Sequence, residues 1–168
     1  MWINFHIQTF RAITLSLFFF GYLPSFGQAT SLLNDNKKTI IRYFDEVINT
    51  QKLNRMGEFF STDYIWHQMN GTDVRSSQDS SHVFTLRFLY KAIPDIHYTI
   101  DNAEVEGNMV AVNSTVTGTA RSEMFGFPAS QKNVRFKQMF FFRLENNKIT
   151  EEWEVVDVEG LKAKLAKQ

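Results

Sequence analysis

The sequence contains no cysteine and has no excess of charge of one sign. Without cysteine the chain can form no disulfide, no thiolate metal site and no thiol nucleophile. Its 168 residues carry 18 lysines and arginines against 18 aspartates and glutamates. A surface that follows nucleic-acid phosphates needs an excess of basic residues. We therefore predict no nucleic-acid partner.

Motifs that hold metals or phosphates are also missing. Of the four histidines, three lie beyond the first thirty residues, at positions 67, 82 and 97, with no His-x-x-x-His or Glu-x-x-His spacing. The chain has neither a glycine-rich phosphate loop nor a Gly-x-Ser-x-Gly nucleophile motif. These patterns predict no metal, no organic cofactor and no serine nucleophile.

Aromatic residues are abundant, at 15% of the chain with 17 phenylalanines. The length fits one domain and leaves little room for two. We expect a compact domain with an aromatic-rich interior.

The first 29 residues have the layout of a secretory signal peptide. One arginine and no acidic residue precede an apolar run over residues 12–23, and small residues at 27 and 29 suit cleavage after Ala29. The run is shorter than the roughly 20 residues that cross a bilayer. We predict a signal peptide at 1–29, a domain at 30–168 with no membrane contact after cleavage, and a secreted or periplasmic location. An uncleaved anchor is the alternative.

The first half of the domain reads as helical. A cap at Asn34 or Asp35 can start a helix to about residue 51, with apolar residues on one stripe. A short helix follows, then a strand over 64–69 that Asn70-Gly71 ends. A third helix, capped at Ser76 or Ser77, ends before Pro94.

From residue 96 the apolar pattern changes to a period of two, which predicts strands. They cover about 96–101, 109–121, 133–144 and 149–156, and a short helix can close the chain at 158–167. Helices followed by a four-stranded antiparallel meander indicate an α+β domain whose helices cover one face of a curved sheet.

The strand over 133–144 is apolar on both faces. Val134, Phe136, Phe140 and Phe142 share one face, and Met139 and Phe141 share the other. An antiparallel sheet with one covered face alternates between apolar and polar residues. We therefore expect the second face to be covered by another copy of the chain, in a homodimer through the sheet.

Two glutamates on the last strand are the strongest candidates for chemistry. Glu152 and Glu154 share one face, about 7 Å apart at the usual rise of a strand. If that face lines an apolar cavity, desolvation and mutual repulsion raise the pKa of a carboxyl group toward neutrality, which suits a general acid or base. The alternative is a solvated acidic strand end.

Other residues could line the same cavity. Gln138 interrupts the apolar row between Phe136 and Phe140, and a buried amide needs hydrogen-bond partners, so it is either a ligand contact or a structural residue. Trp66 and His67 face opposite ways, so at most one of them points into a cavity. His67 could instead be a satisfied core residue. His82 and His97 are expected at the surface.

Several segments, in this order along the chain, resemble the SnoaL-like polyketide cyclases of the NTF2-like superfamily. The resemblance covers nearly all of residues 35–166, and the segments that carry it are KTIIRYFDEVINTQ (38–51), FFSTDYIWH (59–67), IPDIHYTI (93–100), VAVNSTVTG (110–118), GFP (126–128) and NKITEEWEVVDVEG (147–160).

The resemblance implies an NTF2-like, cystatin-like cone in which a strongly curved antiparallel sheet wraps around N-terminal helices, encloses an apolar pocket and often dimerises. It places Glu154 where cyclases of the family carry the aspartate that is the general acid and base of an intramolecular aldol closure. Many members have histidine at the position of Glu152, and histidine or aspartate is common at that of Phe140.

We therefore expect an exported domain that binds a small hydrophobic carbonyl compound. Glu154 is the predicted catalytic residue, and the predicted ligand contacts are Glu152, Gln138, Phe140, His67, Trp66 and Phe136. The chemistry would be that of an aldol-type cyclase or isomerase, or of a hydrolase. The alternative is a non-catalytic binding or assembly module of the same superfamily.

Overall fold

The computed structural model describes residues 26–75, 81–123 and 129–166. Of the predicted signal peptide, residues 1–25 lie outside the described residues, and 26–29 begin helix α1. The predicted cap at Ser76 or Ser77 and the loop 124–128 also lie outside them.

A single six-stranded sheet forms the body of the domain, in the order β2-β1-β6-β5-β4-β3. Strands β3 to β6 form the predicted antiparallel meander, whereas β1 pairs parallel with β6 and antiparallel with β2. The strands are β1 (Phe60–His67), β2 (Asp73–Arg75), β3 (His97–Glu106), β4 (Met109–Thr119), β5 (Asn133–Glu145) and β6 (Lys148–Val156).

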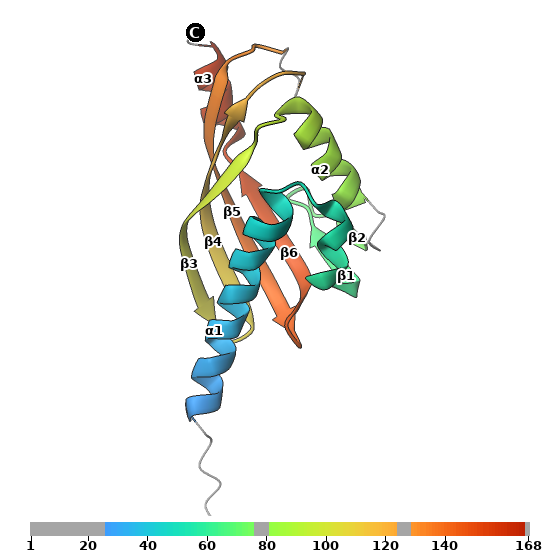
Figure 1. Cartoon of the computed structure of the whole chain (residues 1–168), viewed down its shortest axis with the longest axis vertical. Coiled ribbons are helices and arrows are strands. Elements are labelled where there is room, and N and C mark those ends of the chain that lie inside the picture. The colour runs from blue at the N-terminus through green and yellow to red at the C-terminus, as the bar shows by residue number, and fades with distance from the viewer. Residues whose placement is uncertain (1–25, 76–80, 124–128, 167–168) are drawn as a thin grey trace, which may run out of the picture.

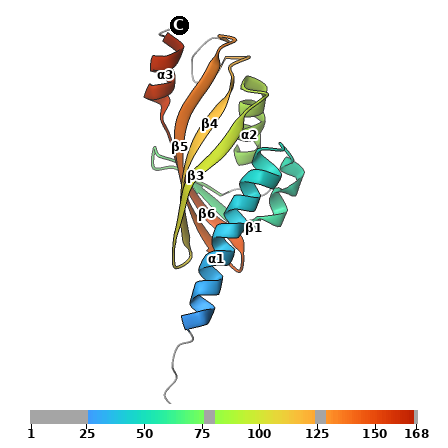
Figure 2. The same ribbon diagram turned by 60° about the vertical axis from the view of Figure 1, so that its left-hand side comes forward.

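The helices α1 (Phe26–Tyr43) and α2 (Ser81–Ala92) lie on one face of this twisted sheet, as Figures 1 and 2 show. Helix α1 packs against β3 and β4, and the short helix α3 (Val158–Ala166) packs against β5 at the end where the chain closes. The sheet is curved and does not close into a barrel. No helix in the described part of the chain is long and apolar enough to cross a membrane.

The predicted helix over 34–51 differs from the observed one in its start and its end. Helix α1 begins at Phe26, ahead of the predicted cap, and is followed by a π-helical segment, η1 (Phe44–Ile48). Backbone hydrogen bonds five residues apart mark η1, from Asn49 N to Phe44 O and from Lys52 N to Val47 O. The segment has Phe44, Val47 and Ile48 all buried, and a 3-10 helix, η2 (Leu53–Glu58), leads into β1.

Strand β5 alternates between buried and exposed residues along its whole length. Its even-numbered side chains face the helices and form the aromatic core together with Tyr43, Phe44 and Phe59. The face turned toward the helices is called the inner face below. The opposite, outer face carries Met139 and Phe141 of β5 and Val155 of β6, all exposed in the single chain.

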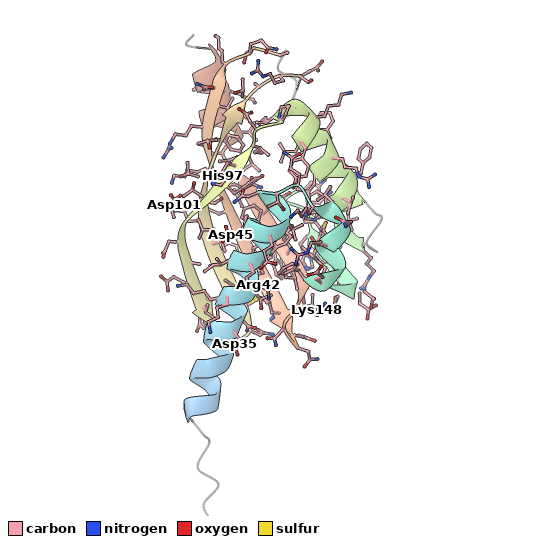
Figure 3. The ribbon with its side chains drawn as sticks, in the orientation of Figure 1. Asp35, Arg42, Asp45, His97, Asp101 and Lys148 are labelled. Atoms are coloured by element: carbon pink, nitrogen blue, oxygen red, sulfur yellow. The ribbon has the colours of Figure 1, made fainter. Side chains whose placement is uncertain are left out.

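The outer face also carries charged side chains. Lys137 of β5 pairs with Asp101 of β3 (Nζ to Oδ2, 2.8 Å). Figure 3 shows Asp101 and His97 on β3, at the side of the sheet away from helix α2. His97 is exposed, as predicted.

Candidate functional site

A cavity of about 280 Å³ lies between the inner face of the sheet and the helices. Its walls are mostly apolar and aromatic, as in pockets for small molecules. The polar exceptions come from α2, β3, β5 and β6. The side chains that line it are Tyr43, Phe44, Ile48, Trp66, His82, Thr85, Leu86, Phe88, Leu89, Tyr98, Phe136, Gln138, Phe140, Glu152, Glu154 and Val156.

Strand β6 brings both glutamates to this cavity because residues two apart on a strand share a face. Glu152 is paired in register with Phe142 of β5 and with Trp66 of β1, and Glu154 is paired with Phe140 of β5. Each carboxyl group is therefore set among large rings rather than among cations.

Glu154 is the more accessible of the two acids. Its carboxylate accepts a hydrogen bond from the amide of Gln138 (2.8 Å), whose own carbonyl oxygen accepts one from the hydroxyl of Tyr98 (3.3 Å). Burial raises the pKa of Glu154 to about 7, although the Gln138 bond favours the charged form and acts in the opposite direction. Near neutral pH this carboxyl group can both take up and release a proton.

Glu152 lies deeper, at 1% exposure, and accepts a hydrogen bond from the hydroxyl of Tyr64 (2.7 Å). The Tyr64 oxygen is also 2.9 Å from Nδ1 of His82. The donor and acceptor roles in that second contact follow the tautomer of His82. The three side chains form a continuous chain, which we call the Glu152–Tyr64–His82 chain.

The two titratable ends of this chain favour their neutral forms. Burial, together with the charge of Glu154, raises the pKa of Glu152 well above its usual value, against the opposing bond from Tyr64. Burial lowers the pKa of His82 to about 4. His82 Nδ1 lies 3.7 Å from the carboxylate, but two neutral groups form no ion pair. Glu152 is therefore placed as a buried polar support rather than as a free base.

Most of the predicted ligand contacts meet at this cavity. Trp66, Phe136, Gln138, Phe140 and Glu152 all line it beside Glu154. Gln138 makes hydrogen bonds through both its amide nitrogen and its amide oxygen. It therefore also fits the alternative prediction, that of a structural residue whose amide is satisfied inside the protein.

The prediction for His67 is wrong. This residue lies on the outer face, where its ring stacks on Trp153 (4.3 Å between centroids) and its nitrogens contact Asp73 and Glu151. The inward position on β1 belongs to its neighbour Trp66, since adjacent residues of a strand face opposite ways.

The expectation of a surface position for His82 is also wrong, because this side chain is buried in the cavity wall. A signal for it was present in the sequence. His82 precedes Leu86 by four residues and Leu89 by seven, so it lies on the apolar stripe of its helix. Among the described residues no three His, Cys, Asp or Glu side chains form a group that could hold a metal ion.

Together, the open curved sheet, the helices on its inner face and the apolar cavity define an α+β domain of the NTF2-like type. The model of the SnoaL-like polyketide cyclase family matches residues 38–165, which is more than half of the chain. The chain belongs to this family.

Solved structures show the same fold at low sequence identity. AclR from Streptomyces galilaeus is 24% identical with a TM-score of 0.70, over 81% of this chain and 98% of its own. IdmH from Streptomyces antibioticus is 21% identical (TM-score 0.69, 78% and 98%). A SnoaL-like polyketide cyclase from Agrobacterium tumefaciens is 19% identical (TM-score 0.67, 77% and 97%). A comparison with curated proteins found no match.

Proposed function

We propose that the cavity binds a small, mostly apolar carbonyl compound and that Glu154 acts on it as general base and then general acid. The observation that carries the proposal is the position of Glu154, a carboxyl group in an apolar cavity with a pKa raised to about 7. Such a group is matched to proton transfer at neutral pH. A polyketide cyclase is among the structural relatives, and this supports the choice of a carbonyl substrate.

The proposed reaction needs only protons already present. Glu154 removes a proton from the carbon next to a carbonyl group, and the electron pair of that C–H bond becomes an enolate. In an aldol closure the enolate carbon attacks a second carbonyl carbon of the same molecule. The proton on Glu154 then passes to the new alkoxide. Gln138 holds the carboxylate in place during these steps through its 2.8 Å hydrogen bond.

The first half of this reaction can be tested without the natural substrate. The probe is acetylnaphthalene in deuterated water, and the readout is deuterium uptake at its acetyl carbon by mass spectrometry. We expect exchange above background with the native protein and a loss of about 100-fold or more with Glu154→Gln. The matched control is Glu104→Gln, an exposed glutamate on β3, which should exchange like the native protein. No exchange with native protein over a panel of apolar ketones would reject the catalytic role.

One observation favours a second candidate, a non-catalytic binding module. The neighbour of Glu154 across the sheet is Phe140, which stacks on Phe142 with ring centroids 5.6 Å apart. No second acid or histidine therefore stands beside Glu154 on β5. If the protein is a binding module, calorimetry should show that it binds apolar ketones. Deuterium exchange should then stay at background for both the native protein and Glu154→Gln.

We also propose that the protein is exported with the leader predicted at residues 1–29. The support is the order of a basic residue, an apolar run and small residues before Ala29. N-terminal sequencing of protein from the periplasm or medium should find a start near Thr30. A retained Met1 would contradict cleavage and favour an anchor.

We propose in addition that the outer face mediates a homodimer. Met139, Phe141 and Val155 expose neighbouring apolar side chains there. Phe141→Glu should give monomers in analytical ultracentrifugation, whereas Phe84→Glu, at an exposed phenylalanine of α2, should not. If Phe141→Glu leaves a native dimer intact, the outer face is not the interface.

A further inference from the structure

Glu154 ends a line of three polar side chains that lies along the cavity wall, with one member each on β3, β5 and β6. The Tyr98 hydroxyl donates a hydrogen bond to the amide oxygen of Gln138 (3.3 Å), and the amide nitrogen of Gln138 donates one to the Glu154 carboxylate (2.8 Å). All three side chains line the cavity, and Tyr98 is buried. We call this line the Tyr98–Gln138–Glu154 relay. Both of its donors point toward Glu154.

The direction of the relay depends on the tyrosine. A side-chain amide can turn over, so that its oxygen accepts the proton of a neutral Glu154 and its nitrogen donates to the Tyr98 oxygen. The Tyr98 hydroxyl proton would then need another acceptor, and in the described part of the chain this hydroxyl bonds only to Gln138. A buried hydroxyl that loses its acceptor costs free energy. The tyrosine therefore keeps the amide nitrogen turned toward Glu154.

We propose that Tyr98 is a positioning residue, which acts through Gln138 to present an N–H donor to Glu154 and so favours the ionised, proton-accepting form of this base. A fixed donor stabilises a charged acceptor more than a neutral one. The inference deepens the proposed function and rests on it, because that function assigns Glu154 as the base. Tyr98 itself does not touch the reacting atoms in this role.

The other titratable groups around the cavity do not favour an ionised Glu154. None of the described side chains that line the cavity is a lysine or an arginine. Glu152 on β6 is held toward its neutral form, and the hydroxyl of Tyr64 on β1 donates to it. Burial lowers the pKa of His82 on α2 to about 4 and raises that of Tyr43 on α1, so both are neutral near pH 7. The relay is therefore the contact that stabilises the charge on Glu154.

The first test follows the titration of Glu154 by carbon NMR of its labelled carboxyl group. Tyr98→Phe removes only the hydroxyl, and we expect it to raise the pKa of Glu154 by about half a unit, as for the weakening of one hydrogen bond. The matched control is Tyr90→Phe, which removes a buried hydroxyl that donates to the Ile48 carbonyl (3.1 Å), and it should leave the titration unchanged. Equal shifts in both variants, or no shift in Tyr98→Phe, would overturn the inference.

A double-mutant cycle tests whether Tyr98 acts through Gln138. Gln138→Met keeps the length of the side chain and removes the amide, so it should raise the pKa of Glu154 by about one unit. Adding Tyr98→Phe to this variant should then change the titration little, because the relay is already broken. Additive shifts would show that Tyr98 reaches Glu154 by another route, and would overturn the inference.

A third measurement uses native protein alone and so does not depend on the folding of a variant. The Gln138 amide protons should move downfield in nitrogen–proton spectra as Glu154 ionises, because a charged acceptor makes the stronger hydrogen bond. A Gln138 signal that stays in place through this titration would overturn the inference. Deuterium exchange into acetylnaphthalene is measured separately. If exchange fails while the titrations behave as expected, the catalytic role is rejected and the relay is confirmed.

Discussion

The two faces of strand β6 give neighbouring glutamates opposite surroundings. Glu151, on the outer face, contacts Arg143 (3.0 Å) and His67 (3.1 Å) and lies next to solvent. Glu152, on the inner face, has no cation at its carboxylate and accepts its hydrogen bond from the phenol of Tyr64. Glu151 and Glu152 are therefore consecutive in the chain, yet the first is an ion-paired surface acid and the second is a buried acid without a cation.

This contrast arises because alternate residues of a strand face opposite sides of the sheet, so neighbouring carboxyl groups can have different surroundings. Glu151 makes its polar contacts with Arg143 and His67 on the outer side of the strand, close to solvent. A carboxylate among rings is held toward its neutral form, and its proton becomes available to a ligand. Glu152 and Glu154 both line the cavity from the inner face, and Glu154 differs in being the more accessible acid and in accepting its hydrogen bond from Gln138 rather than from Tyr64.

The largest effect should come from the packing difference between the faces. Phe142 is 0% exposed and contacts the rings of Tyr43, Phe44 and Phe140, whereas Phe141 is 46% exposed. We expect Phe142→Ala to lower the free energy of unfolding by about 3–5 kcal/mol in urea titrations. Phe141→Ala should cost less than about 1 kcal/mol in a monomer. A larger cost that depends on protein concentration would instead place Phe141 in an interface.

A smaller effect should appear in the pH dependence of stability. The pKa of Glu154 is raised from 4.5 to about 7 on folding, so the folded state holds a proton that the unfolded state has lost between these values. Stability therefore falls as pH rises through this window. Glu154→Gln removes the penalty, so the variant should gain about 2–3 kcal/mol over native protein at pH 8, relative to their difference at pH 4. If urea titrations give the same difference in the free energy of unfolding between the two proteins at pH 4 and at pH 8, the burial of Glu154 is contradicted.

The same group sets the pH dependence of the proposed reaction. Base catalysis requires ionised Glu154, so deuterium exchange into acetylnaphthalene should rise about tenfold per pH unit below pH 7 and level off above it. The Glu151→Gln variant should keep this profile, since Glu151 faces away from the cavity. A midpoint near 4.5 would mean that Glu154 is exposed to water in the working protein.

The smallest effect should come from the outer acid itself. Glu151→Gln breaks contacts with Arg143 and His67 that lie close to solvent, so we expect less than about 1 kcal/mol of destabilisation, and less still at high salt. A cost of several kcal/mol in urea titrations would show that the outer face is buried in the protein's natural assembly.

The sequence predicted the elements that depend on local patterns. The period-two segments predicted the four strands of the meander, and the strand period placed Glu152 with Glu154 on β6 and Gln138 with the apolar row of β5. The resemblance to the SnoaL-like family supplied the cone, which the structure confirms.

What the sequence did not reveal depends on contacts between distant residues. The parallel pairing of β1 with β6 joins residues more than eighty positions apart, and no local pattern encodes it. This pairing brings Tyr64 next to Glu152 and so creates a buried partner for His82. The position of His67 was missed for the same reason, because only the pairing decides which face of β1 meets the cavity.

The π-helical segment after α1 has a consequence for the history of the chain. A wide turn of this kind holds one residue more than an α-helical turn, as an insertion would leave it. Deleting one residue within 44–48 would let this turn tighten to α-helical geometry, and the preceding helix would keep nearly the same direction. Ile40 and Tyr43 would then keep their buried positions against the sheet. The wide turn is thus a place where the chain can change its length by one residue without moving the aromatic core.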